Sequence, residues 1–392
     1  MGKGTITITA RHYLRYRIIT AFVIAASILQ FAFGQSLKGK TYPPEWKRFT
    51  SPESGLQVIQ LTSDKELSCG LYFYNDCFNL KDSILVFASK RTGSMNLFTV
   101  DLRSGIIRQL TDGKKIKARG ASYSAKRNEV FFGDDHVVKA LDLLTLNERV
   151  LYEIPKGYNL AASLSVNTAG SMIAFALVKK PKGDVSMNEG KVYNSTIVTI
   201  NTVTGYAREV TKEESYISHV IINPVDTTKI LYCHEGAWDT VAQRMWFVRS
   251  DGSGKAALRP EENPLLRVGH EYWFKDGNKV GYQIGTQEQR KYIGILDIAT
   301  KEFKEYPYAD DKHTQSNSKG TMFVGDGMPK HADISLYTVG GSKLQKKVLF
   351  RHGSSYADED QHPHPMFSPD DTSVFFTSDR DGVSNIYIIP LQ

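Results

Sequence analysis

Cysteine is scarce in this sequence of 392 residues, which holds only Cys69, Cys77 and Cys233. So few cysteines exclude the disulfide frameworks that hold small secreted domains together. Cys69 and Cys77 lie eight residues apart and could form one bridge in an oxidising compartment, but two buried free thiols fit the pattern equally well. Cys233 lies within an apolar run, residues 230–233, so we expect a core residue there rather than a nucleophile.

Linkers and long amphipathic helical stretches are also lacking. No Pro- or Ser-rich segment and no block of charge divides the chain, so residues 35–392 are expected to form one domain. No Gly-x-Ser-x-Gly elbow occurs, which argues against a peptidase with an α/β-hydrolase domain. Lys and Arg are scattered and form no stripe with aromatic residues, so nucleic-acid binding is not expected.

The N-terminal 34 residues have the features of a signal peptide. Arginines precede a mostly apolar stretch, residues 18–33, and small residues at Ala32 and Gly34 favour cleavage before Gln35. We therefore expect an exported protein, periplasmic or secreted, with an uncleaved N-terminal anchor as the alternative. Removal of the segment takes away one lysine and three arginines, so the net charge falls from +7 to about +3.

A repeated unit is the strongest structural signal. Near the C-terminus, residues 367–371, 374–378 and 385–389 read as a turn, a strand and, after a hairpin, a second strand. The same unit recurs in residues 81–111, and its turn anchors are spaced 42 to 56 residues apart. The seven anchors are Asp82, Arg127, Ala169, Val225, Asp276, Ser318 and Pro369. This spacing predicts an all-β fold, a seven-bladed β-propeller with four strands in each blade.

Closure of the ring requires one strand from elsewhere, because only about three strands follow the last turn. Residues 55–62 resemble the edge segment at residues 107–111 and stand before the first full blade. We predict that residues 56–62 form the outer strand of the last blade. This pairing would remove an open sheet edge.

His362 and His364 form the strongest candidate for a metal site. In an extended segment, alternate side chains project to one side, and the rigid Pro363 between them fixes the backbone. Gln361 precedes the pair, and three acidic residues lie close by: Asp358, Glu359 and Asp360. Nitrogen and oxygen donors without a thiolate suit Mn, Fe, Ni or Zn better than Ca. The alternative is a solvated histidine-rich loop.

The other histidines are less informative from the sequence. His270 stands at the head of an aromatic strand and His234 follows an apolar run, and each could equally be a hydrogen-bonded core residue. His219 gives a weaker signal. Four more carry no usable pattern: His136, His313, His331 and His352.

A set of motifs, one in each appropriate blade, resembles that of the oligogalacturonate lyases. These metal-dependent enzymes split short pectin fragments by β-elimination. The similarity covers nearly all of the chain after residue 34, and several motifs in the order of the family are specific where a single His-Glu-Gly would mean little. The motifs are residues 69–78, 231–236, 244–246, 269–273, 325–327, 362–365 and 376–379.

The resemblance implies a divalent metal, commonly manganese, bound through His270, His362, His364 and a glutamine. The sequence departs from the family at the last ligand. The glutamine of the family stands three residues before the first histidine of the His-Pro-His pair, where this chain has Glu359. Gln361 is immediately before that histidine, so either Gln361 or Glu359 could complete the metal shell.

The resemblance also implies a catalytic base, His234, and an arginine that binds a uronate carboxylate. A neutral imidazole can accept the C5 proton of a uronate near neutral pH. Arg244 is the candidate for the carboxylate clamp, with an ion pair between blades as the alternative. The expected substrate is a uronic-acid oligosaccharide.

A non-catalytic exported propeller that binds glycan or protein, as in the Tol system, is the competing interpretation. The repeat unit itself, with Ser368 to Asp370 at its turn, is shared by such proteins. Convergent imidazoles are not needed for simple binding, so the histidines favour the lyase.

Overall fold

The computed structural model describes residues 1–2, 36–81, 83–179, 194–236, 241–259, 266–286, 291–308 and 311–392. The predicted signal segment, residues 1–34, lies outside these ranges apart from Met1 and Gly2. Within the described ranges, no helix has the length and apolar character needed to cross a membrane. Residues 38–392 form one compact unit built almost entirely of β-strands.

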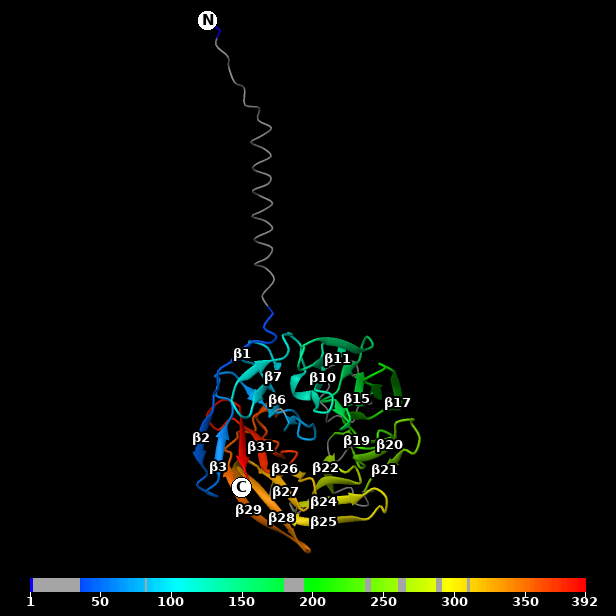
Figure 1. Cartoon of the computed structure of the whole chain (residues 1–392). Coiled ribbons are helices and arrows are strands. Elements are labelled where there is room, and N and C mark those ends of the chain that lie inside the picture. Colours follow the sequence, from blue (N-terminus) through cyan, green and yellow to red (C-terminus); the bar gives the residue numbers. More distant parts are fainter. Residues whose placement is uncertain are drawn as a thin grey trace. The chain divides into compact units, whose positions relative to one another are not determined.

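Seven antiparallel sheets form the blades of a β-propeller (Figure 1), as the repeat spacing predicted. The first blade holds β4 (Ser68–Cys69), β5 (Phe78–Asn79), β6 (Ile84–Ser89), β7 (Asn96–Asp101) and β8 (Ile107–Gln109), with β1 (Thr41–Tyr42) beside β8. The second holds β9 (Ser122–Ser124), β10 (Glu129–Asp134), β11 (Val137–Asp142) and β12 (Glu148–Glu153). The third holds β13 (Asn159–Leu160), β14 (Ser165–Val166), β15 (Met172–Lys179), β16 (Asn194–Asn201) and β17 (Ala207–Glu213).

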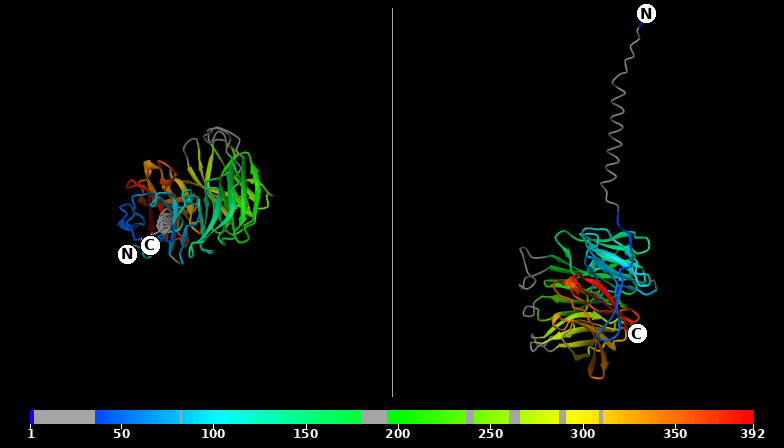
Figure 2. Two further views of the ribbon diagram at one scale, coloured as in Figure 1. Left: turned by 90° about the horizontal axis from the view of Figure 1, so that it is seen from above. Right: turned by 90° about the vertical axis from the view of Figure 1, so that its left-hand side faces the viewer.

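The remaining blades follow in chain order, and Figure 2 shows the sheets from two further directions. The fourth holds β18 (Tyr216–Ile222), β19 (Lys229–Glu235), β20 (Met245–Arg249) and β21 (Ala256–Ala257). The fifth holds β22 (Arg267–Trp273), β23 (Lys279–Gly285), β24 (Lys291–Asp297) and β25 (Phe303–Tyr308). The sixth holds β26 (Asp311–Ser316), β27 (Met322–Gly327), β28 (Asp333–Gly340) and β29 (Lys343–Arg351). The seventh holds β30 (Met366–Phe367), β31 (Ser373–Ser378), β32 (Asn385–Pro390), β3 (Gln57–Gln60) and β2 (Lys47–Thr50).

In the part of the chain that the structure describes, three short 3-10 helices interrupt the loops: η1 (Ala118–Gly120), η2 (Pro329–His331) and η3 (Glu359–Gln361). The core lies between adjacent sheets, so the central strands of a blade are buried on both faces. Leu85 of the first blade and Val130 of the second belong to one hydrophobic cluster, as do Val324 of the sixth and Phe376 of the seventh. Burial on both faces explains why β6 and β31 are continuous apolar runs rather than alternating ones.

The N-terminal segment closes the ring, which confirms the closure prediction, but β2 rather than β3 is the outermost strand of the last blade. In β3, Ile59 pairs with Ile388 of β32, and Val58 is fully buried in the core of the last blade. The Thr62 hydroxyl adds a hydrogen bond of 2.9 Å to the Asn385 side chain. Preceding residues pair with the first blade through β1 and β8, so one short segment contacts both sides of the junction.

All three cysteines are buried free thiols, so Cys69 and Cys77 do not form a bridge. Cys233 lies in β19 and is fully buried, as expected for a core residue. Burial raises the pKa of its thiol, and nearby carboxylates act in the same direction. A thiol of this kind is a poor nucleophile.

The first strands of the fourth, fifth and sixth blades share an irregularity that matters for function. Their pairing shifts register around residues 218–219, 270–271 and 312–313, respectively. Such β-bulges re-aim side chains and are common next to active sites. Each irregular pair includes one histidine: His219, His270 and His313. β22 and β26 lie near the middle of the ring in Figure 1.

Candidate metal centre and active-site cavity

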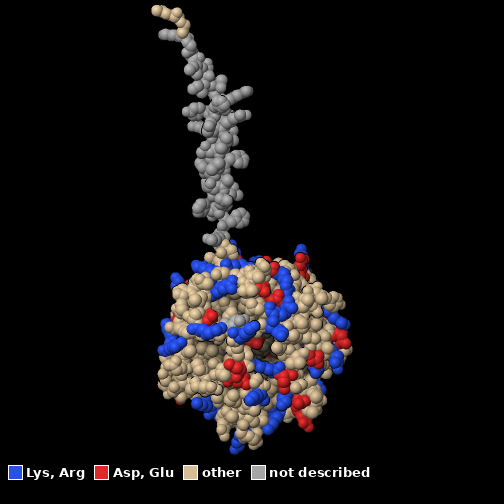
Figure 3. Space-filling view, viewed as in Figure 1, with Lys and Arg blue, Asp and Glu red and all other residues tan. Residues whose placement is uncertain are grey.

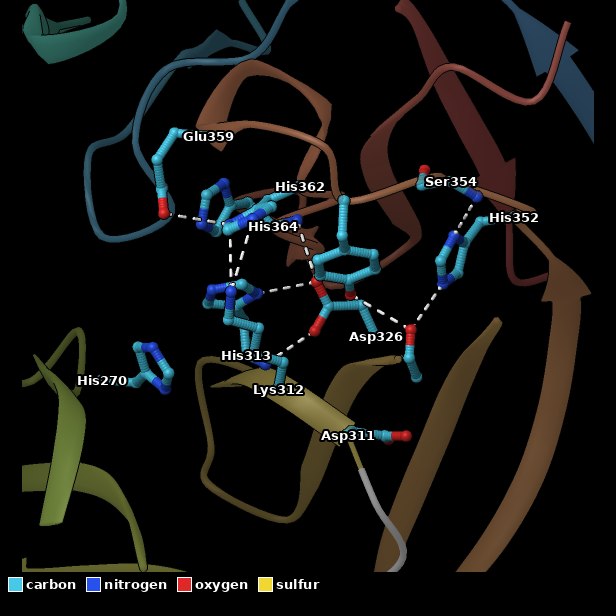
Figure 4. A network of polar contacts seen from close by, with 12 residues as sticks. His270, Asp311, Lys312, His313, Asp326, His352, Ser354, Glu359, His362 and His364 are labelled. Carbon is cyan, nitrogen blue, oxygen red and sulfur yellow. Dashed lines mark hydrogen bonds and ion pairs between the residues drawn. The ribbon is translucent and has the colours of Figure 1, made fainter. Parts of the chain in front are cut away.

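Three buried histidines from two blades meet near the middle of the propeller (Figure 4). His313 comes from β26, whereas His362 and His364 come from the loop between η3 and β30. One donor atom from each ring lies within 4.8 Å of the other two. The ring centroid of His313 is 4.1 Å from that of His364 and 5.4 Å from that of His362. The structure therefore brings the predicted His-Pro-His pair together with a histidine that the sequence analysis did not single out.

Each of the three rings is oriented by a charged neighbour. His313 donates from Nδ1 to Asp326 Oδ2 at 2.8 Å, and His362 Nδ1 lies 3.3 Å from Glu359 Oε1. His364 Nδ1 accepts from the Arg119 guanidinium at 3.0 Å. Carboxylates that hold the far nitrogen of an imidazole are typical of metal sites, because they fix the ring and its tautomer.

The chemistry of the cluster fits a divalent first-row metal ion. Burial lowers the pKa of both His313 and His364 below the usual imidazole range, so both rings are neutral near pH 7, the form that binds metal. Nε2 of His364 is buried and has no hydrogen-bond partner within the described residues. An unsatisfied buried nitrogen beside two other imidazoles is a destabilising arrangement that a bound ion would satisfy.

Backbone geometry supports a functional role for this loop. His364 has φ of +44°, a conformation that residues other than glycine rarely adopt. His270 has φ of +52° at the bulge of β22. Two neighbouring histidines with strained backbone conformations indicate that the direction of their side chains is important enough to offset the cost of that strain.

His270 lies beside the cluster rather than within its 4.8 Å set. Its ring centroid is 4.6 Å from that of His313, and its Nδ1 lies 2.6 Å from Gln283 Oε1. Because an amide oxygen only accepts, Nδ1 carries the proton and Nε2 is left as an acceptor. Burial lowers the pKa of His270 to about 3, and neighbouring His313 acts in the same direction. The ring also lines the main cavity.

His234 occupies a different environment. Its ring packs 5.0 Å from that of Trp246, and its Nε2 lies 3.7 Å from Glu213 Oε2. It is not among the residues that line the cavity. Gln361 also faces away from the imidazoles, because its Oε1 accepts from the Asp358 backbone N–H in the capping box of η3. Of these two residues, Glu359 rather than Gln361 contacts the cluster, through His362 Nδ1.

Arg244 lines the cavity at the entrance to β20. Its guanidinium bonds Glu235 Oε1 at 2.8 Å and the Gly236 carbonyl at 3.3 Å. Burial would lower the pKa of Arg244, but Glu235 outweighs it and raises the pKa further. Glu235 therefore holds the cation in place at the cavity wall, within the fourth blade.

The cavity has a volume of about 600 Å³, within the range of small-ligand sites. Basic side chains outnumber acidic ones on its wall. The basic residues are Arg119, Arg244, Arg267, Lys291 and Lys312, and the acidic ones are Glu235, Asp311 and Glu359. Figure 3 shows a hollow near the centre of one face with charged side chains at its rim. Such a wall favours a ligand with several negative charges.

Sequence analysis missed His313, although a signal was present. Counted along the chain, His219, His270, His313 and His364 follow one another at intervals of 51, 43 and 51 residues. These intervals match the blade repeat, so each histidine stands a few residues before the turn anchor of its blade. Equivalent positions of successive blades lie around the axis of a propeller, so this spacing indicates that the four histidines come close together.

These observations define a β-propeller with a candidate metal centre beside a cavity that has a basic wall. Comparison with known proteins identifies the family. The sequence pattern of the family described as oligogalacturonate lyase matches residues 36–392. The chain therefore belongs to the oligogalacturonate lyase family, and it is a lyase of the class that the motifs indicated.

Individual relatives agree along nearly their whole length. The chain is 28% identical to an oligogalacturonide lyase of Pectobacterium atrosepticum, over 90% of this chain and 97% of that one. It is 28% identical to an oligogalacturonate lyase of Dickeya dadantii with the same coverage. A solved oligogalacturonate lyase in complex with manganese is 25% identical and superposes with a TM-score of 0.85, covering 91% and 98% of the two chains. A second, from Vibrio parahaemolyticus, gives a TM-score of 0.82 at 25% identity, covering 91% of this chain and 99% of that one.

Proposed function

We propose that this protein cleaves short oligogalacturonates by metal-assisted β-elimination, giving one product with an unsaturated uronate end. Family membership and the fold support the reaction class. The observation that carries the proposal is the buried cluster of His313, His362 and His364 at a cavity with a basic wall. Acidic sugars meet there both a metal centre and fixed positive charges.

The proposed metal ligands are His313, His362 and His364, with Glu359, whose carboxylate contacts His362, as the candidate oxygen ligand. Manganese is the proposed ion, because three imidazoles and a carboxylate suit it and a similar lyase was solved with manganese. When bound, a divalent ion supplies Lewis acidity that stabilises the negative charge developing on a uronate carboxylate. His270, expected from the sequence to be a ligand, is assigned another role.

We propose His270, in place of His234, as the base that removes the C5 proton. His270 lines the cavity, and its Nδ1–H is held by Gln283, so Nε2 presents a lone pair. Burial keeps the ring neutral before substrate binds. Negative charge on the bound uronate favours the imidazolium that forms during the reaction. His234 packs against Trp246 and lacks access to the same space.

Arg244 is proposed to bind a substrate carboxylate. A guanidinium presents paired donors that match the two oxygens of a carboxylate, and Glu235 orients it by one of its nitrogens. Arg244 immediately precedes β20 in the fourth blade, and the sixth-blade residues Asp311 and Lys312 line the same cavity. The substrate would then be held by fixed charges on more than one blade.

The test is an ultraviolet assay for the unsaturated uronate product with di- and trigalacturonate. Metal-free protein should be inactive, and stoichiometric manganese should restore turnover. Absence of metal-dependent turnover on any uronate oligosaccharide would contradict the proposal and favour a propeller that only binds glycan.

We also propose that the protein acts after export, in the periplasm or outside the cell. The arginine-rich start, the apolar stretch at residues 18–33 and the small residues before Gln35 support this location. N-terminal sequencing of protein from a fractionated expression host tests it. A chain that begins at Gln35 in the exported fraction is expected, whereas a full-length chain in the cytoplasm would contradict export.

A further inference from the structure

A chain of hydrogen bonds runs from a buried carboxylate to the cavity next to the metal centre. Glu271 Oε1 lies 3.0 Å from His219 Nδ1, and His219 Nε2 lies 3.0 Å from the Tyr72 hydroxyl. Glu271 is fully buried, whereas His219 and Tyr72 both line the cavity. Neither the metal ligands nor the proposed base belongs to this chain.

The order of these groups is that of a hydroxyl aligned by an imidazole, which is aligned in turn by a carboxylate. The bulges of β18 and β22 create it, because His219 and Glu271 both lie at positions where the strand pairing shifts. Tyr72 comes from the segment between β4 and β5 in the first blade. Residues from three blades are therefore needed to assemble the chain.

Tyr72 and the proposed base contact different histidines of the metal cluster. The Tyr72 ring centroid is 5.1 Å from that of His364, whereas His270 contacts His313 at 4.6 Å. Arg119 lies over the Tyr72 ring, 5.5 Å from its centroid. Both Tyr72 and His270 line the cavity, so a sugar bound there can contact both residues.

The buried pair of His219 and Glu271 leaves the Tyr72 hydroxyl proton available to a ligand in the cavity. Burial opposes charge on the His219 ring, whereas negative charge at Tyr72, at Cys233 and at Glu271 raises the pKa of His219 well above its usual value. Burial also raises the pKa of Tyr72 to about 12, so the phenol keeps its proton near neutral pH. Burial also opposes charge on Glu271, yet its hydrogen bond to His219 lowers the pKa of this carboxyl to about 2. An imidazolium donates from both nitrogens, so Tyr72 accepts from Nε2 and its own O–H can point elsewhere.

Building on the proposed function, we propose that Tyr72 donates the proton to the departing glycosidic oxygen, with His219 and Glu271 as positioning residues. His270 takes the C5 proton, the C4–O bond breaks with its electron pair on oxygen, and that oxygen takes the Tyr72 proton. The phenolate that remains faces the His219 imidazolium. Solvent then restores the proton to Tyr72 and removes the one on His270, so the reaction consumes no net proton.

A second metal site at His219, Cys233 and Glu271 is the competing interpretation, since their donor atoms lie within 4.8 Å of one another. Both nitrogens of His219 already make hydrogen bonds, and burial raises the pKa of the Cys233 thiol. A metal would need a deprotonated thiol and a free imidazole nitrogen. The hydrogen-bonded chain therefore explains these contacts better.

Tyr72→Phe tests the role, with Tyr74→Phe as the matched control. Tyr74 is a neighbouring tyrosine whose hydroxyl bonds Ser163, and it does not line the cavity. Both variants and the wild type are assayed in the presence of manganese on two substrates. The first is trigalacturonate, and the second is a galacturonide with a nitrophenoxy group at C4, which leaves as nitrophenolate. Loss of a general acid slows the sugar substrate by roughly 10²–10⁴. Nitrophenolate leaves without protonation, so on that substrate Tyr72→Phe should act close to wild type.

The outcomes separate this inference from the proposed function. Wild-type enzyme without activity on either substrate would overturn both. Activity of Tyr72→Phe equal to wild type on trigalacturonate would overturn only the role of Tyr72. Equal loss on both substrates would assign Tyr72 to binding or folding instead and would also overturn the inference.

Glu271→Gln tests the positioning role with little change in shape. It should slow the sugar substrate and spare the nitrophenolate substrate, as Tyr72→Phe does, while manganese content stays at the wild-type level. The double variant with Tyr72→Phe should then be no slower than Tyr72→Phe alone, because the two residues act as one unit. If the rate losses of the two single variants added up in the double variant, Glu271 and Tyr72 would not act through the same hydrogen-bonded chain.

Discussion

His313 decides whether the metal centre is assigned correctly. His313→Ala removes one of the three imidazoles, so we expect loss of bound manganese and of turnover together. Metal analysis beside the ultraviolet assay provides the measurement. His136→Ala is the control, because that side chain is exposed and distant from the cavity lining. Full metal content in His313→Ala would require a different ligand set.

Two histidines compete for the role of base, and their variants should differ. His270→Ala should retain manganese but lose roughly 10²–10⁴ in rate, the usual contribution of a positioned base. His234→Ala should retain both metal and nearly all activity, because His234 lies against Trp246 outside the cavity lining. Turnover by each variant, normalised to bound metal, is the measurement. The reverse pattern would restore the base assignment that the sequence motifs suggested.

The sequence indicated which neighbouring residues form a local motif, but it did not show which side chains from different blades meet at the site. His362 and His364 are two residues apart, so their closeness in the chain alone keeps the two rings near each other. His313 and Glu271 acquire their roles from strands that come from other blades, and only the packed ring brings them to the cavity. The choice of Glu359 over Gln361 depends on η3, whose capping box uses the glutamine side chain.

Strand β3 is the element on which closure depends. Val58 is fully buried in the last blade, so Val58→Ala should lower the free energy of unfolding by about 2 kcal/mol through lost contacts and a small cavity. Thermal unfolding followed by circular dichroism provides the measurement. Val203→Ala makes the same chemical change at an exposed position and should have little effect. An equally small effect at Val58 would mean that β3 contributes little to the last blade.

The repeats allowed the strands to be predicted, whereas the β-bulges within those strands could not be predicted. Each blade supplies a turn and apolar strands at similar spacing, and the pairing of residues 56–62 with the last blade followed from counting strands. The bulges at residues 270–271 and 312–313 leave no periodic trace, because a register shift depends on the neighbouring strand. For this reason the directions of His270 and His313 emerged only from the structure.

Acid should lower the stability of the metal-free fold over a defined pH range. His270, His313 and His364 all have pKa values lowered by burial, so the folded chain binds fewer protons than the unfolded chain below about pH 6.5. Their contribution to stability is complete above that pH and is lost as pH falls toward the folded values. The melting temperature of chelator-treated protein should therefore decline from pH 7 to pH 5.

A variant provides the internal check on that decline. His364→Gln removes one buried imidazole, so its melting temperature should fall less steeply over the same range than that of the wild type. An identical slope would show that other groups, such as surface carboxylates, govern the acid response.

The order of synthesis has a consequence for a ring closed in this way. The hydroxyl of Thr62 and the side chain of Asn385, which meet at the junction, are 323 residues apart in the chain. The strand made first must therefore wait, with its apolar face unpaired, until the last strand has left the ribosome. Six blades can form as they emerge, whereas the seventh is completed only after β32 has emerged. Any truncation near the C-terminus leaves both the beginning and the end of the chain as open sheet edges.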